Sequence, residues 1–527
     1  MIKTESYNCY EYFKNNTAAF GDYDAAIHFG HRIKRSALLS DIDRLAAYFK
    51  SAGLRRGDVY TVFLPTCVQS FVAFYALNKI GVIANIVHPL TPPELLKETM
   101  DEVGSKGIML MDLLAKPYVD MLNFHNIPCV ICSNSDYVSP ATQPAFRAYE
   151  LFAAHASTGI KNALGYRTVL RRYPPSDGVK NNGADVAVYL HGGGTTGKSK
   201  TIKLSSKALN ELAYKTGQIE HHNTPGVECS MIVLPLFHAF GLGVSMHFSM
   251  CEGFCCIPVP RFKPRRANEL MREYKVSFIV GVPNMYKKML EQKNFEGKHL
   301  RNLELLFSGG DIVTEPFLDR FNATVAKWGG TGRLFRGYGL TEVSSVCCAN
   351  TYAEFKRNSV GRPFYGMRIE IWDKDNNRLP ANTVGEIAVS GSTLMEGYLN
   401  EPTSGLDPVS RDELLDIFIS LAQDEGKTVF CSTHITSDLD RCADNIIYLK
   451  QGRIAENEPL CTLLQKYSVV RFSADNAPNG AELIGVRREK DGMSALVRNS
   501  ELPAGVESAP AGLEDIMVHI EREDETK

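Results

Sequence analysis

The sequence lacks a marked excess of charge of either sign. It contains 58 Lys and Arg residues against 60 Asp and Glu residues, which leaves a formal net charge of −2. Proteins that hold nucleic acid or a lipid surface by general electrostatics carry a basic excess. The composition therefore argues against both kinds of partner. With 44% hydrophobic and 22% charged residues, the 527-residue chain has the make-up of an ordinary globular protein of several domains.

Three further patterns are missing. The 13 cysteines include no Cys-x-x-Cys pair and no Cys/His cluster with zinc-ligand spacing, so we expect reduced thiols. The first residues, MIKTESYNCYEYF, lack the basic and apolar segments of a secretory signal. The most apolar stretch, 231–259, is interrupted by Pro235, His238, His247 and Glu252, which indicates buried core rather than a membrane-spanning helix of about 20 residues. We therefore expect a cytoplasmic protein without membrane insertion.

Helical patterns alternate with short β-rich runs along the first part of the chain. This rhythm predicts an α/β fold of βαβ units, with mainly parallel sheets covered by helices in two related layers. Short alternating runs between Arg333 and Tyr398 predict a small β-rich subdomain at about 333–400. The helical patterns lie at 40–54, 68–81 and 205–217, and the β-rich runs lie at 59–65, 82–89, 186–191 and 230–236.

One segment, VYLHGGGTTGKSKTIKLS at 188–205, has the composition of a polyphosphate-binding loop. Glycines let backbone amides approach a phosphate closely, while hydroxyl and ammonium groups add hydrogen bonds and positive charge. The residues concerned are Gly192, Gly193, Gly194, Thr195, Thr196, Gly197, Lys198 and Lys200. Residues 192–199 also fit the Walker pattern G-x-x-x-x-G-K-[ST]. The loop alone therefore leaves two classes of nucleotide-binding protein open.

Further motifs follow the loop in a fixed order and decide between these classes. They are PLFHAFGLG at 235–243, GVPNMY at 281–286, LFSGGD at 306–311, RGYGLTE at 336–342 and GEIAVSGSTLMEGYLN at 385–400. Together with the loop they resemble the adenylate-forming superfamily of acyl-CoA synthetases, luciferases and peptide-synthetase adenylation domains. The resemblance covers residues 1–400 and implies a large N-terminal ligase body.

The resemblance also implies a two-step reaction. A carboxylate attacks the α-phosphorus of ATP and expels pyrophosphate, and the thiol of CoA or of a carrier then displaces AMP. Thr195, Thr196 and Lys200 match the residues that hold the outgoing phosphates, and Ser199 stands where the family usually has Pro. An apolar acyl tail is expected from the residues around 240–244 and 282–286.

Other positions match the family's nucleotide site. Tyr338 matches the aromatic residue that stacks on adenine, Thr341 the hydroxyl near the α-phosphate, and Glu342 the carboxylate that holds Mg²⁺. His238 matches a residue that guards the acyl pocket and the thiol approach. The turn of Gly309, Gly310 and Asp311 matches the one that borders adenine, and Gly339 belongs to the YGLTE motif.

The pattern changes after Asn400. The family normally continues to a T-G-D motif and a lid with a catalytic lysine, but this chain reads EPTSGLDPVSRDELL and then KTVFCSTHITSDLDRCADNIIYLKQGRI. That stretch resembles ATP-binding-cassette (ABC) ATPases from their Walker B glutamate onward. Glu401 matches the catalytic carboxylate, Asp407 the end of the SGLD loop, and His434 the switch histidine.

We therefore expect a partial ABC domain at 401–466 and a variable tail at 467–527, fused to the ligase body at a shared Glu-Pro-Thr. A ligase without its lid is expected to be slow. Two alternatives remain open at this stage: a non-catalytic nucleotide or acyl binder, and an ABC-type ATPase subunit that works with a membrane permease.

Overall fold

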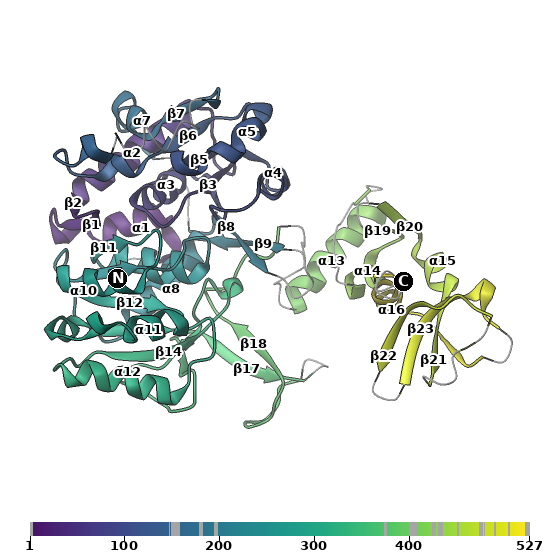
Figure 1. Ribbon diagram of the computed structural model, residues 1–527. Coiled ribbons are helices and arrows are strands. Elements are labelled where there is room, and N and C mark those ends of the chain that lie inside the picture. The colour runs from purple at the N-terminus through teal and green to yellow at the C-terminus, as the bar shows by residue number, and fades with distance from the viewer. Residues whose placement is uncertain are drawn as a thin grey trace. The chain divides into compact units, whose positions relative to one another are not determined.

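The computed structural model divides into two compact units, Met1–Leu399 and Asn400–Lys527 (Figure 1). The structure describes residues 4–146, 148, 159–178, 183–193, 199–373, 377–399, 408–423, 428–429, 436–450, 453–473, 478, 480–489, 492–503 and 506–521. Among these residues, no helix combines the length and the apolar character that crossing a membrane requires.

Two large sheets organise the first unit, one of seven and one of nine described strands (Figure 1). Across the seven-stranded sheet the order is β7 (Ala163–Gly165), β6 (Cys129–Cys132), β5 (Ser105–Met111), β3 (Val59–Phe63), β4 (Ile83–Ile86), β8 (Val186–Gly193) and β9 (Ser199–Ser205). Across the nine-stranded sheet it is β16 (Arg362–Pro363), β15 (Cys348–Ala349), β14 (Arg333–Tyr338), β13 (Leu305–Ser308), β12 (Val276–Gly281), β10 (Cys229–Ile232), β11 (Cys255–Pro258), β1 (Asp24–His28) and β2 (His31–Lys34).

Both sheets are parallel through their centres and antiparallel only at their edges. In the smaller sheet only the β8–β9 pair is antiparallel, and in the larger sheet only the pairs of β2, β15 and β16 are. Every residue of β3 and of β12 is buried, as expected for parallel strands covered by helices on both faces. The α/β fold with mostly parallel sheets that the sequence predicts is thus confirmed.

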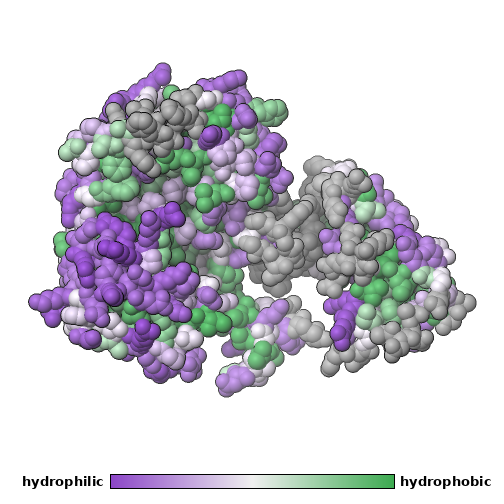
Figure 2. All heavy atoms as spheres, in the orientation of Figure 1, coloured by the Kyte–Doolittle hydropathy of each residue, from purple (hydrophilic) through white to green (hydrophobic). Residues whose placement is uncertain are grey.

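Helices cover the sheets and fill the space between them. They are α1 (Cys9–Asn16), α2 (Arg35–Ser51), α3 (Val68–Lys79), α4 (Pro93–Glu102), α5 (Val119–His125), α7 (Tyr166–Arg172), α8 (Ser206–Gly217), α9 (Ser249–Cys251), α10 (Pro264–Glu273), α11 (Pro283–Leu290) and α12 (Glu315–Lys327). Helix α3 is buried along its whole length, whereas α10 carries the exposed Arg265 and Arg266, both paired with Glu269. Figure 2 shows a largely hydrophilic surface on this side of the first unit.

The apolar stretch 231–259 lies in the core, as the sequence predicts. It runs from β10 into η7, a π-helix at Phe240–Phe248, and then through α9 into β11. Near the end of η7, Nδ1 of His247 lies 3.0 Å from the hydroxyl of Tyr75 on α3. This hydrogen bond links the π-helix to α3, which packs against β3 and β4 of the seven-stranded sheet. A π-helix is uncommon and often lies at a functional site.

Smaller antiparallel elements complete the description. Strands β17 (Arg368–Trp372) and β18 (Glu386–Ser390) form a two-stranded ribbon in the first unit. The second unit contains α13 (Pro408–Gln423), α14 (Thr436–Cys442), the hairpin of β19 (Asn445–Lys450) and β20 (Arg453–Pro459), and α15 (Leu460–Lys466). It also contains a sheet in the order β22 (Ile484–Glu489), β23 (Gly492–Arg498), β21 (Tyr467–Phe472) and β24 (Ser508–Pro510), with α16 (Leu513–Glu521).

Candidate functional site

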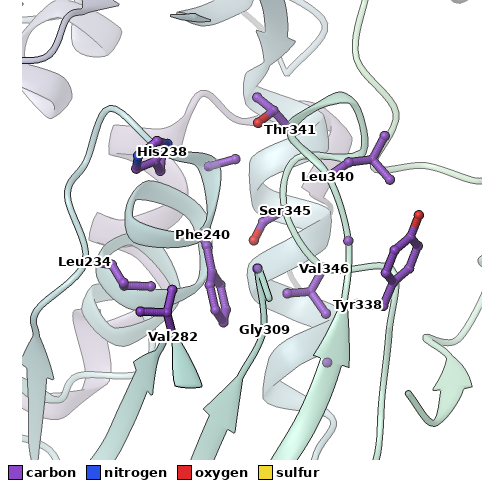
Figure 3. Close-up of a pocket in the computed structure, with 14 residues that line it drawn as sticks. Leu234, His238, Phe240, Val282, Gly309, Tyr338, Leu340, Thr341, Ser345 and Val346 are labelled. Atoms are coloured by element: carbon purple, nitrogen blue, oxygen red, sulfur yellow. The ribbon is translucent and has the colours of Figure 1, made fainter. Parts of the chain in front are cut away.

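A cavity of about 280 Å³ opens where the carboxyl ends of β12, β13 and β14 meet the start of η7. Ligand sites in α/β sheets form preferentially at this edge. Figure 3 shows Phe240 near the middle of the wall, with Leu234 and Val282 on one side of its ring and Gly309 and Val346 on the other. The residues that line it are Leu234, His238, Ala239, Phe240, Val282, Gly309, Gly310, Gly337, Tyr338, Gly339, Leu340, Thr341, Ser345 and Val346.

Glycines form much of the floor beside Tyr338. A Cβ atom built at Gly309 would lie 3.1 Å from the carbonyl oxygen of Gly337, and one built at Gly339 would lie only 1.6 Å from the carbonyl oxygen of Ser345. Gly310 has a φ of +77°, a left-handed conformation that favours glycine. The result is a smooth backbone surface beside an aromatic ring, which suits a flat heteroaromatic base.

The turn that carries Thr341 and Glu342 ends in two residues with strained backbone. Ser344 and Ser345 have positive φ values of 61° and 136°, which cost energy for non-glycine residues. The turn is held by the Ser345 amide, which donates to the Leu340 carbonyl at 3.2 Å, and by the Ser344 hydroxyl, which donates to the Thr393 carbonyl at 2.8 Å. Strain of this kind is often found at binding sites.

His238 lies at the exposed rim of the cavity. Desolvation of its ring and the neighbouring His88 both lower the pKa of His238 below its usual value. The imidazole is therefore neutral at pH 7, and it can accept a proton or a hydrogen bond there. Its ring contacts that of Phe237, with centroids 4.6 Å apart.

The base of the glycine-rich loop is fixed by a buried polar network. His191 pairs with Thr201 across β8 and β9, and its Nε2 lies 2.7 Å from Oδ1 of Asn85 on β4. Burial lowers the pKa of His191 to about 4, so the ring is neutral. It then donates from Nε2 to Asn85 and accepts from the Thr201 hydroxyl at Nδ1, 3.2 Å away. The two ends of the loop are thus held side by side.

Lys200 and Glu342 meet at a residue that the motifs did not single out, Tyr398. The Tyr398 hydroxyl donates to Oε1 of Glu342 at 2.8 Å. The ammonium group of Lys200 lies 4.6 Å from the centroid of the same ring. The lysine of the loop and the carboxylate of the YGLTE motif are far apart in the sequence. They nevertheless contact one side chain, the lysine at its ring and the carboxylate at its hydroxyl.

The structure brings together several residues that the sequence predicts. His238, Gly309, Gly310, Tyr338, Gly339 and Thr341 line the one cavity. Gly192 and Gly193 lie on β8, where they pair with Lys200 and Ser199. Asp311 does not line the cavity; its carboxylate accepts from the amide of Ile312. Gly194, Thr195, Thr196 and Gly197 lie outside the described residues, as do Glu401, Asp407 and His434.

Other residues of the site were not expected from the sequence. Leu234, Ser345 and Val346 line the cavity, and Tyr398 contacts both charged groups. Leu234 and Val346 carry no chemical signal beyond apolar character. Tyr398 lies inside the segment 385–400, but only the fold shows what its side chain contacts.

Comparison with known proteins gives consistent results. The model of a family described as AMP-binding enzyme matches residues 13–399. A long-chain-fatty-acid–CoA ligase from Bacillus subtilis is 26% identical over 399 residues, which cover 74% of this chain and 70% of that protein. A 4-coumarate–CoA ligase from Arabidopsis thaliana is 25% identical over 387 residues, which cover 71% of this chain and 63% of that protein.

Solved structures share the fold. A benzoate CoA ligase from Burkholderia xenovorans superposes with a TM-score of 0.64 and 16% sequence identity. The superposition covers 77% of this chain and 75% of that one.

Proposed function

Because the chain belongs to the AMP-binding enzyme family, we propose that it activates a carboxylic acid with ATP and passes the acyl group to CoA. One observation carries this proposal: Tyr338, Thr341 and a largely apolar wall line one cavity. An adenylate-forming reaction needs this combination, because the base must be anchored while a carboxylate oxygen attacks the α-phosphorus in line with the departing pyrophosphate. The acid is a fatty or other apolar acid, since leucine, phenylalanine and valine form the wall beyond Gly309.

The proposed roles combine the motif resemblance with the lining of the cavity. Tyr338 stacks on adenine above the glycine floor, and Thr341 hydrogen-bonds the α-phosphate. Lys200, together with Thr195, Thr196 and the loop amides, holds the pyrophosphate as it leaves. Alignment of the acid with the α-phosphorus and stabilisation of the growing charge then lower the barrier. His238, which is neutral at the rim, lies where the thiol or the acid would enter.

Glu342 fits the Mg²⁺ that such a reaction requires. Carboxylate oxygens are the ligands that Mg²⁺ prefers, and it is commonly held by one or two carboxylates together with substrate phosphates. One Glu342 oxygen is oriented by the Tyr398 hydroxyl. When bound, the ion neutralises charge on the phosphate oxygens.

The acyl side of the proposal gives a mutational prediction. Phe240, Gly337 and Val346 border both the main cavity and a small apolar space that is also lined by Thr216, Val244, Phe307, Ala349 and Phe364. Phe240→Ala is expected to join the two and to raise kcat/KM for a longer acid over a shorter one by about tenfold, the effect of roughly one or two methylenes in an apolar pocket. A series of straight-chain acids measures this ratio. Phe317→Ala on α12 removes a partly buried ring elsewhere, and an equal shift in that variant would contradict the assignment.

The proposal has a second part, concerning 401–527. The motif EPTSGLDP and the residues Glu401, Asp407 and His434 support an origin of 401–466 in an ABC ATPase. Residues 401–527 also lack the T-G-D motif and the lid sequence that the resemblance implies. We therefore expect acid activation to be about 10²–10³-fold slower than in ligases that have these contacts. A factor of this size is the usual cost of losing one contact to transition-state charge.

Exchange of labelled pyrophosphate into ATP tests the function directly. We expect exchange that depends on an added apolar acid and on Mg²⁺. ATP hydrolysis that is independent of acid and abolished by Glu401→Gln would instead support an ATPase. ATP binding that is weakened by Tyr338→Ala but is accompanied by no exchange with any acid would support a binder.

A further inference from the structure

Backbone hydrogen bonds of its own segment fix the position of Tyr398. It forms an isolated antiparallel bridge with Ile202 on β9. The Lys203 amide donates to the Gly397 carbonyl at 3.0 Å, and the Leu399 amide donates to the Thr201 carbonyl at 2.8 Å. The segment 395–399 therefore runs beside β9 as a short added strand, two residues away from Lys200.

The same segment is also attached to the turn that carries Glu342. The amide of Met395 donates to the backbone carbonyl of Glu342 at 2.7 Å. Tyr398 thus has its main chain on the strand of the loop lysine and its hydroxyl on the carboxylate of the turn. A shift of either element changes the position of the Tyr398 ring relative to the other.

The chemistry of a phenol suits this position. Its ring face attracts a cation, while its hydroxyl donates a hydrogen bond that orients a carboxylate and leaves the negative charge in place. A lysine in direct contact with the carboxylate would instead neutralise the charge that attracts a metal ion. Tyr398 can therefore align Lys200 and Glu342 while both remain charged.

We propose that Tyr398 is a positioning residue that sets Lys200 and Glu342 in register for a Mg²⁺–polyphosphate ligand, a role that rests on the proposed function. The ring holds the cation that meets the phosphates, and the hydroxyl holds the carboxylate that meets the metal. Tyr398 itself acts through these two groups. The segment after β18 therefore contributes to ATP binding although it follows the phosphate loop by about 200 residues in the sequence.

Two substitutions separate the two contacts. Tyr398→Phe keeps the ring beneath Lys200 and removes the hydroxyl from Glu342, whereas Tyr398→Leu removes both. Calorimetric titration of the full chain with ATP, in EDTA and in excess Mg²⁺, is the readout. We expect Tyr398→Phe to weaken ATP binding about tenfold in Mg²⁺ and to leave it unchanged in EDTA. We expect Tyr398→Leu to weaken binding in both conditions. Tenfold corresponds to about 1.4 kcal/mol, close to the lower end of the range for a hydrogen bond to a charged group.

A double-mutant cycle distinguishes positioning from a general structural role. If Tyr398 acts through Glu342, Tyr398→Phe has no further effect on Mg²⁺-dependent binding in a Glu342→Gln background. Tyr118→Phe is the matched control, because it removes a tyrosine hydroxyl that donates to the Thr91 carbonyl at 2.7 Å, away from the cavity. Additive effects of the two substitutions, or equal weakening in EDTA and Mg²⁺ by Tyr398→Phe, would overturn the proposal.

The outcome for wild-type protein separates this inference from the function on which it rests. Acid-dependent exchange by the wild-type protein, together with unchanged ATP binding in Tyr398→Phe, would contradict only the role of Tyr398 and would leave the proposed function standing. Wild-type protein that neither exchanges pyrophosphate nor binds ATP would contradict the function and, with it, this inference.

Discussion

Glu342→Gln is expected to lower the rate of acid-dependent pyrophosphate exchange about 10²–10³-fold, the usual cost of removing one charged group that stabilises a transition state. The fold should be unaffected, because Glu342 is only half-buried and glutamine still offers an oxygen to the Tyr398 hydroxyl. What is lost is the negative charge that Mg²⁺ requires. The exchange rate as a function of Mg²⁺ concentration is the measurement, and the variant should need far more Mg²⁺ to reach half its maximum.

Glu396→Gln is the matched control for this substitution. Glu396 lies on the neighbouring segment, is exposed, and its charge acts on Lys203, so the same loss of charge occurs close to the site but away from the proposed metal position. It should change the exchange rate less than about threefold. If Glu342→Gln retained the wild-type rate and Mg²⁺ dependence, the assignment of Glu342 as the metal ligand would be wrong.

The fold could be predicted from hydrophobic patterning because parallel strands and their covering helices leave strong local signals. The runs at 59–65 and 82–89 correspond to β3 and β4, and the apolar pattern at 68–81 corresponds to α3. The order of strands within each sheet could not be predicted in this way. For example, β1 pairs with β11, more than two hundred residues later in the chain, and nothing in either strand specifies its partner.

The site shows the same division between local and non-local information. Motifs in the sequence pointed to His238, Tyr338 and Thr341, and these do line one cavity. The contacts of Tyr398 depend on the pairing of 395–399 with β9, which is a matter of register between distant segments. The positive φ values of Ser344 and Ser345 could not be predicted from the sequence either. Serine has no preference for that conformation, and tertiary contacts impose it.

Gly339→Ala is the second substitution for which we expect a large effect. A Cβ atom at this position would lie 1.6 Å from the Ser345 carbonyl oxygen, so the turn must move to accept it. Tyr338 precedes Gly339 and Glu342 follows it closely, and a displacement of about 1 Å can cost about 10²-fold in rate. We expect a loss of this size in exchange, with weaker ATP binding. At Gly165, which does not line the cavity, a Cβ atom would have an ordinary contact, 3.7 Å from the Thr168 hydroxyl oxygen, so Gly165→Ala should bind ATP with near wild-type affinity. If both variants bound ATP equally well, close packing of this turn would not be what positions the nucleotide.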